Sequence, residues 1–244
     1  MDQALAAARQ QPVAYVDETG APTGNSDPNN PTGKRGWQWL MVTALVTVFA
    51  QGLSRSTVVI ELLGNAFGRI VVSDHFSAYN HLPVMQRQLC WAHVIRDLVA
   101  IVERPGASAE FVPILLGLQQ QLFGRWYHYK EETIDWPALQ QSCRPIRQAF
   151  ETTLQRVVEL GYQRGERMPR ANTVRTCQQL QKVRGGLWTF LETRGIEPIN
   201  NAAVRTLRQS VIQRKITFGV QSASGAIWRS RLLSVNRVAP LRVV

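Results

Sequence analysis

The sequence lacks the features that mark secreted and membrane proteins. Only three of its 244 residues are cysteines, an odd number at wide spacing, which argues against a disulfide framework and favours a reducing compartment. No apolar run reaches the roughly 18 residues of a membrane span, and the longest candidate, Trp39–Gly52, alternates as strands do. The first residues have no apolar stretch typical of a signal peptide. These absences predict a cytoplasmic protein with no membrane partner.

Acidic residues are also few. The chain has 17 Asp and Glu against 28 Lys and Arg, a formal net charge of +11. An excess of this size favours nucleic acid as a polyanionic partner over a merely basic, soluble surface. No glycine-rich phosphate loop of the Walker type is present. Apolar residues make up 45% of the chain, enough for the core of one domain, or of one domain with an insertion.

Short β-type runs alternate with helical patterns in the first hundred residues. Pro12–Asp17 predicts a buried strand that ends in an acid, and the turn-rich stretch 20–36 predicts a loop or hairpin tip. Two runs after this loop should form an antiparallel meander with the first strand. The remaining expectations are strands at Trp37–Thr43, Leu45–Gln51, Arg69–Ser73 and Gln86–Cys90, with helices at Ser56–Leu63, opened by a capping serine, and Ala92–Glu103.

The middle of the chain changes character. Between Ser108 and Arg194 apolar residues recur at helical spacing and strand signals are absent, which predicts an all-helical insertion. Helices at Asn200–Gln213, opened by asparagine caps, and at Gly225–Val235 should follow. We therefore expect an α/β fold whose mixed sheet is flanked by helices, with a first part of the core at 1–107, the helical insertion at 108–195 and a returning part of the core at 196–244.

Two acids stand where chemistry is expected. Asp17 and Asp74 each follow a predicted strand, and strand ends are where α/β folds place ligands. With a third carboxylate from a helix, they could hold two divalent metals that align an attacking and a leaving oxygen on phosphorus. The alternative is that Asp17 is a turn residue and Asp74 a helix N-cap.

Five short motifs, by their residues and by their order along the chain, resemble the IS66 family of insertion-sequence transposases. The resemblance covers roughly residues 12–235. It implies an RNase H-like fold, cleavage of DNA at transposon ends and joining to a target, and an Asp-Asp-Glu site for Mg²⁺ or Mn²⁺. The motifs are Asp17-Glu18-Thr19, the Trp37/Trp39 strand, Ser73-Asp74-His75-Phe76-Ser77-Ala78-Tyr79, Cys90-Trp91-Ala92-His93-Val94-Ile95-Arg96-Asp97, and Asn200-Asn201-Ala202-Ala203-Val204-Arg205-Thr206-Leu207-Arg208 followed by Arg214-Lys215.

The resemblance identifies Asp17 and Asp74 as the first two catalytic, metal-binding acids. The family's glutamate stands where this chain has Val204, whose alkyl side chain can neither bind metal nor accept a proton. Its spacing from Leu207 predicts that Val204 faces inward, toward the sheet. Glu18 should point to the opposite side of its strand and so cannot replace the missing acid. We expect a copy impaired in catalysis.

The two ends of the chain also depart from the family. Related transposases carry DNA-binding and zinc-binding parts before the core, whereas this chain starts almost at the first strand. The tail 236–244 does not continue the expected last helix. Both departures predict a truncated copy.

Basic residues near the third catalytic position are candidates for DNA contact, because the guanidinium group suits phosphate. A solvated helix face is the alternative. These residues are Arg205, Arg208, Arg214 and Lys215, and a second basic group in the insertion comprises Arg164, Arg167, Arg170 and Arg175.

Three further signals favour structural roles. Cys90 and His93 have zinc-ligand spacing but no second pair, so Cys90 is expected in the core and His93 in a satisfied polar contact. His75 could line the site beside Asp74 or start a helix in solvent. The aromatic cluster at Trp126–Tyr129 should pack the insertion rather than stack on bases.

Three functions remain as hypotheses. The first is a transposase core in the bacterial cytoplasm, associated with the nucleoid, whose partners are DNA ends, target DNA and a second copy of the chain. The second is a non-catalytic DNA-binding remnant that interferes with an active transposase. The third is an unrelated RNase H-like nuclease, against which the Cys-Trp-Ala-His and Asn-Asn-Ala-Ala stretches argue.

Overall fold

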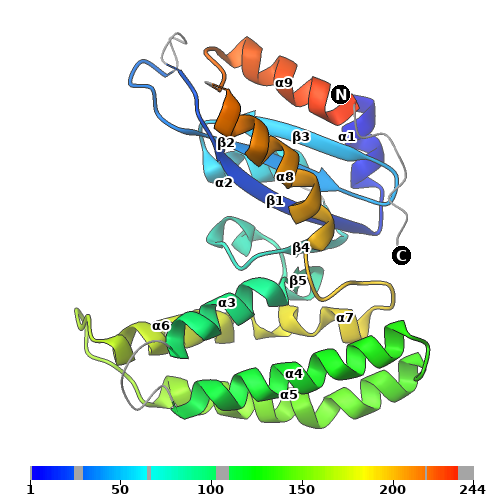
Figure 1. Ribbon diagram of the computed structural model, residues 1–244, viewed down its shortest axis with the longest axis vertical. Helices are drawn as coiled ribbons and strands as arrows, with labels where there is room; N and C mark the ends of the chain where they lie inside the picture. Colours follow the sequence, from blue (N-terminus) through cyan, green and yellow to red (C-terminus); the bar gives the residue numbers. More distant parts are fainter. Residues whose placement is uncertain (1, 25–29, 65–66, 103–109, 218, 236–244) are drawn as a thin grey trace. The chain divides into compact units, whose positions relative to one another are not determined.

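The computed structural model describes residues 2–24, 30–64, 67–102, 110–217 and 219–235. The described chain divides into two compact units: residues 1–87 with 199–244, and residues 88–198. The first carries most of the sheet and the second is mainly helical (Figure 1). The expected tail at 236–244 lies outside the described residues.

The first unit is built on a mixed sheet, which confirms the predicted α/β class. Strand order is β3-β2-β1-β4-β5. The first three strands form an antiparallel meander, and β4 runs parallel to β1. Their bounds are β1 Val13–Ala21, β2 Gly36–Val42, β3 Thr47–Gly52, β4 Ile70–Ser73 and β5 Arg87–Leu89.

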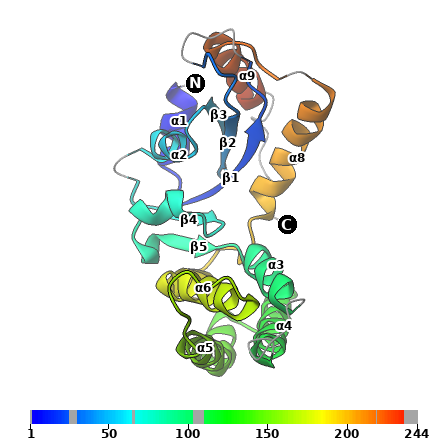
Figure 2. The ribbon, with the colours of Figure 1, turned by 90° about the vertical axis from the view of Figure 1, so that its left-hand side faces the viewer.

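Helices cover both faces of this sheet (Figure 2). One face packs Val16, Trp39 and Met41 against α1 and α2. The other packs Leu40 and Phe49 against α8 and α9. This alternation follows from the pleat, which sends successive side chains to opposite faces. The helices are α1 Asp2–Arg9, α2 Arg55–Leu63, α8 Asn201–Ile216 and α9 Ala223–Val235, with 3₁₀ turns at Ser77–His81 and Val84–Gln86.

One expectation about helix starts is wrong, and another holds only in position, because Asn200 is the N-cap residue of α8. The N-cap of α2 is Ser54, whose Oγ accepts from the Thr57 N–H at 3.2 Å, rather than Ser56. Asn200 stands before α8 but makes no capping bond with its side chain. Its Nδ2 instead donates to the carbonyl of Val16 at 2.8 Å, so this asparagine joins α8 to β1. Helix α1 was not expected from the sequence.

The second unit is helical, as the spacing between Ser108 and Arg194 predicts. Its core is aromatic: the Trp91 ring lies edge-on to Trp188, with centroids 5.4 Å apart, and to Phe150, at 5.2 Å. The Trp91 Nε1 donates to the Leu187 carbonyl at 2.9 Å. This unit includes α3, which the sequence-based division placed with the core. Its helices are α3 Trp91–Val102, α4 Phe111–Lys130, α5 Trp136–Glu159, α6 Pro169–Lys182 and α7 Thr189–Glu192, with a 3₁₀ turn at Arg184–Leu187.

Across the residues that the structure describes, no helix is long and apolar enough to cross a bilayer.

Candidate functional site

Asp17 and Asp74 occupy matching places relative to two neighbouring parallel strands, β1 and β4. The last pair in the register of β1 with β4 is Tyr15 opposite Val72. Asp17 and Asp74 each follow two residues later. Because the strands run in the same direction, both acids lie at the same end of this parallel ladder.

Asp17 is not at the end of its strand, so that expectation is wrong, as is the alternative that it is a turn residue. Pairing of β1 with β2 continues to Ala21 opposite Gly36, whereas its pairing with β4 stops at Tyr15. The antiparallel hairpin with β2 therefore continues β1 beyond the last residue that pairs with β4. Asp17 lies within β1, two residues beyond this last pair.

Asp17 and Glu18 belong to opposite faces of the sheet. Tyr15 packs with the cluster beneath α8 and α9, and Val16 with the cluster beneath α1 and α2. Because side chains alternate along a strand, Asp17 shares the α8 face and Glu18 the α2 face. The contact of Glu18 with Arg55 of α2 agrees with this assignment.

The turn that follows β4 holds Asp74. Its Oδ1 accepts from the Phe76 N–H at 3.0 Å, and the Ser73 Oγ donates to the Asp74 carbonyl at 2.8 Å. This is a turn in which the aspartate side chain satisfies a backbone donor. The next helical turn, Ser77–His81, has Phe76 at its N-cap position, so Asp74 is not the helix cap considered as an alternative. His75 beside it is half-buried.

Glu18 is a charged residue of this region that sequence reasoning set aside. Its side chain is only 3% exposed, and its Oε1 accepts from the Arg55 Nε at 2.9 Å. The pKa of Glu18 is raised to about 7: burial is the largest cause, the negative charges of Asp74 and Asp17 add to it, and Arg55 opposes them. No spacing rule links residues 37 positions apart, so the sequence offers no signal for this pair.

The same carboxylates raise the pKa of Tyr79. This tyrosine is fully buried, and its pKa lies well above the usual range, first because of burial and then because of Glu18, Asp74 and Asp17. The middle of β1, which carries Asp17 and Glu18, and the turn after β4, which carries Asp74, therefore bring acidic residues together. A cation would be stabilised there.

Val204 does not occupy the inward position expected for it. It is 39% exposed, whereas Ala203 is fully buried and Leu207 is 5% exposed. Successive helical residues are about 100° apart, so the buried stripe through Ala203 and Leu207 leaves Val204 on its flank. The spacing of Val204 from Leu207 is compatible with a shared face, but the buried face is centred on Ala203 and Leu207 and not on Val204. Within the described ranges, no three His, Cys, Asp or Glu side chains gather as a metal site requires.

The basic residues of α8 fall into two groups. Arg205 and Arg208 are exposed. Arg214 instead donates from Nη1 to the Thr19 Oγ1 at 2.7 Å and to the Gly20 carbonyl at 2.6 Å. Arg214 therefore ties the helix to β1. The side chain of Lys215 lies outside the described residues.

The second basic group and the remaining motif residues take part in local structure. Arg170 pairs with Glu166 four residues earlier, and Arg175 donates to Asn172 at 2.9 Å. Cys90 is buried, as expected. Trp126 is also buried, with its ring edge-on to Phe190 at 5.3 Å, while Tyr127 is exposed and His93 is half-buried.

The comparisons with known proteins give one match. A family model described as "Transposase IS66 family" matches residues 1–227. No curated protein matches the chain, and no solved structure matches it.

Proposed function

Because the chain belongs to the IS66 family of transposases, we propose that it is an RNase H-like catalytic core that binds DNA and is impaired in strand cleavage and joining. The observation that carries this proposal is the matched placement of Asp17, in β1, and Asp74, in the turn directly after β4, each two residues beyond the last pair of the parallel ladder. The impairment rests on Val204, at the place where the family has its glutamate.

The sheet supports the RNase H-like assignment. An antiparallel meander of β1, β2 and β3 comes first, and α2 then leads to β4, which returns parallel to β1. The chain comes back to this sheet with α8 after the helical unit, and α8 packs over β1 and β2. Such a return would bring the third catalytic position to the same face as Asp17.

The donor set suits a divalent metal in part. Asp17 and Asp74 offer the hard carboxylate oxygens that Mg²⁺ or Mn²⁺ accepts, and they would hold the ion. Such an ion supplies charge neutralisation and alignment of the oxygens on phosphorus during strand cleavage. Val204 adds no donor, and Glu18 is engaged with Arg55 on the other face. We therefore propose weak metal binding.

Arg205 and Arg208 are proposed to contact DNA phosphates. Both are exposed on α8, next to position 204, and the chain as a whole carries a formal net charge of +11. Exposed arginines can pair with phosphate through their fork of donors without giving up an internal contact. Arg214 has such an internal contact and is assigned to holding α8 in place.

A second candidate is a DNA-binding remnant that interferes with an active transposase. The observation that favours it is the same Val204, because a copy that binds ends without cutting them would compete for those ends. Mixed oligomers with an intact copy would have the same effect. Mixing this chain with an active relative separates the two candidates, because only the remnant lowers the relative's joining rate without itself joining DNA.

The proposal is tested by DNA binding and cleavage measured side by side. The protein should bind duplex DNA with an affinity that falls steeply with salt, because bound phosphates release counterions. It should show little nicking or joining with Mg²⁺ or Mn²⁺. Absence of DNA binding would refute the proposed function, and efficient metal-dependent joining would refute the impairment. Preferred cleavage of RNA–DNA hybrids would favour the nuclease hypothesis instead.

A further inference from the structure

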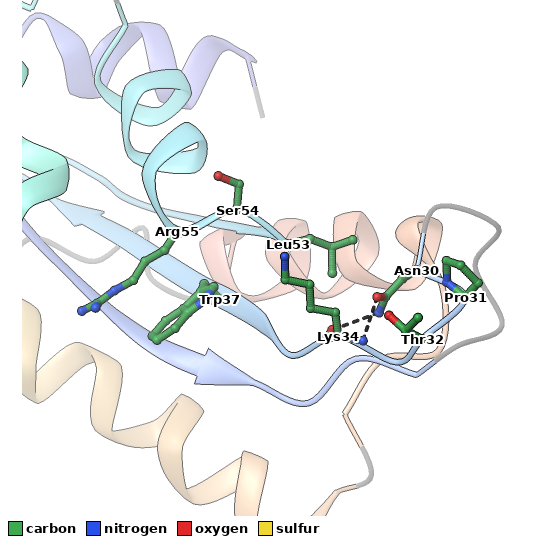
Figure 3. A pocket seen from close by; sticks show the side chains of 8 residues that line it. All are labelled: Asn30, Pro31, Thr32, Lys34, Trp37, Leu53, Ser54 and Arg55. Atoms are coloured by element: carbon green, nitrogen blue, oxygen red, sulfur yellow. Dashed lines mark hydrogen bonds between the residues drawn. The ribbon is translucent and has the colours of Figure 1, made fainter.

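A cavity of about 500 Å³ lies where β2 begins, on the α2 side of the sheet. It is bordered by the turn before β2, by the start of β2 and by the N-terminus of α2 (Figure 3). A volume of this order is typical of pockets for small ligands. The lining residues used below are Asn30, Thr32, Lys34, Trp37, Ser54 and Arg55.

One wall is a turn organised by a buried asparagine. Asn30 is 3% exposed, its Nδ2 donates to the carbonyls of Gly24 and Lys34, and its Oδ1 accepts from the Lys34 N–H at 2.8 Å. Gly33 completes the turn with a φ of 62°, a conformation that glycine adopts without strain. The backbone that carries Lys34 is therefore set in advance of any ligand.

The floor is aromatic and rigid. Trp37 is half-buried, and the Arg55 guanidinium lies 4.5 Å from the centroid of its ring and 3.5 Å from that of Phe76. Glu18 fixes this guanidinium from the far side. Figure 3 shows the indole of Trp37 between the side chains of Arg55 and Lys34. An indole held this way is a preformed surface for stacking.

The charge of the cavity selects an anionic ligand. The described residues that line it include two cations, Lys34 and Arg55, and no Asp or Glu. Arg55 is already paired with Glu18, whereas Lys34 is exposed and extends toward the segment that carries Ser54 (Figure 3). The hydroxyls of Thr32 and Ser54 add neutral donors. The cavity therefore combines an aromatic ring on which a base can stack, that of Trp37, with an ammonium group that can bind phosphate, that of Lys34.

We propose that this cavity takes one unpaired nucleotide of the bound DNA, with its base against Trp37 and its phosphate on Lys34. The inference rests on the proposed DNA-binding function and deepens it. Arg55 connects the cavity to Glu18, which lies on the α2 face of β1, one residue along the strand from Asp17. A strand end separated from its partner strand at the site supplies such a nucleotide.

The test compares a blunt duplex with the same duplex carrying mismatched, frayed end bases. The frayed end contains 2-aminopurine, whose fluorescence is quenched by stacking. We expect the frayed duplex to bind about tenfold more tightly, because stacking of a base on an aromatic side chain contributes on that order. Binding should also quench the 2-aminopurine.

Two variants report on the site and two serve as matched controls. Trp37→Leu should remove both the preference and the quenching, and Lys34→Glu, at an exposed position that leaves the core intact, should remove the preference. Trp228→Leu and Lys182→Ala change an exposed tryptophan and an exposed lysine elsewhere and should change neither. Equal binding of frayed and blunt duplexes, or a preference that survives Lys34→Glu, would overturn the inference while DNA binding stands. Failure to bind either duplex would instead refute the proposed function.

Discussion

Restoring a carboxylate at position 204 is the sharpest perturbation available. Val204→Glu places on α8 the glutamate that the resemblance predicts at this position, and the N-terminal end of α8 is tied to β1 by the bond from Asn200 to the Val16 carbonyl. If α8 presents position 204 to Asp17 and Asp74, the variant should bind Mg²⁺ more tightly than the parent protein. Stability against unfolding then reports the binding, because a ligand that binds only the folded state stabilises it.

The exposure of residue 204 sets the effect expected without metal. Because Val204 is 39% exposed, a glutamate there stays in contact with water, and the free energy of unfolding should change by no more than about 0.5 kcal/mol. A pairing with Arg208, four residues along the helix, would add about 0.3–0.5 kcal/mol. A buried position would have given a large loss instead.

Added metal should separate the variant from its parent. At a Mg²⁺ concentration 100 times the dissociation constant, binding adds about 2.7 kcal/mol to the free energy of unfolding. For a protein of this size that corresponds to a rise in Tm of about 5–10 °C. The parent should respond weakly, because its two remaining acids lack a third ligand.

The assay is thermal unfolding with and without Mg²⁺ for a set of matched variants. Val204→Gln introduces a side chain of the same size as glutamate but without its charge. Ile212→Glu adds a negative charge at another exposed position of α8. Neither should gain a response to Mg²⁺. Adding Asp74→Asn to Val204→Glu should abolish the gain. Equal metal responses in Val204→Glu and Ile212→Glu would show that position 204 does not face the acids and would refute this reasoning.

Three further outcomes follow from the contacts described above. Replacing both Arg205 and Arg208 with Ala should reduce the slope of log affinity against log salt by about 2, because each phosphate contact contributes about 0.9; an unchanged slope in a binding titration would show that they do not touch phosphate. Arg214→Ala should leave that slope unchanged and lower the free energy of unfolding by about 1–3 kcal/mol, because its bonds to β1 are lost; denaturant titration measures this. Arg55→Ala should lower the free energy of unfolding by about 1–3 kcal/mol in the same titration, because Glu18 loses its hydrogen-bond partner and, with a pKa already raised to about 7, takes up a proton, and adding Glu18→Gln should recover part of the loss. A double variant no more stable than Arg55→Ala alone would contradict this account.

Local patterns explain which parts of the fold could be predicted. The strands β2 and β4 and the helices of the second unit follow from spacing that each segment carries within itself. The two acids could be found because each stands within a motif of the family, and Asp74 also follows directly after β4. The same reasoning misplaced the cap of α2 by two residues, because Ser54 and Ser56 are both acceptable caps by composition.

The sequence by itself determined the α/β class, the helical nature of the middle of the chain, the positive charge and the alkyl side chain at position 204. These properties depend on residue identity and on spacing within one segment. Only the tertiary structure decided which side of α8 is buried, because that depends on the position of the helix over β1 and β2 and leaves Val204 on the flank. It also decided that Glu18 meets Arg55 and that Arg214 meets β1. Such contacts join residues far apart in the chain, and no local spacing encodes which distant partner will satisfy a buried charge.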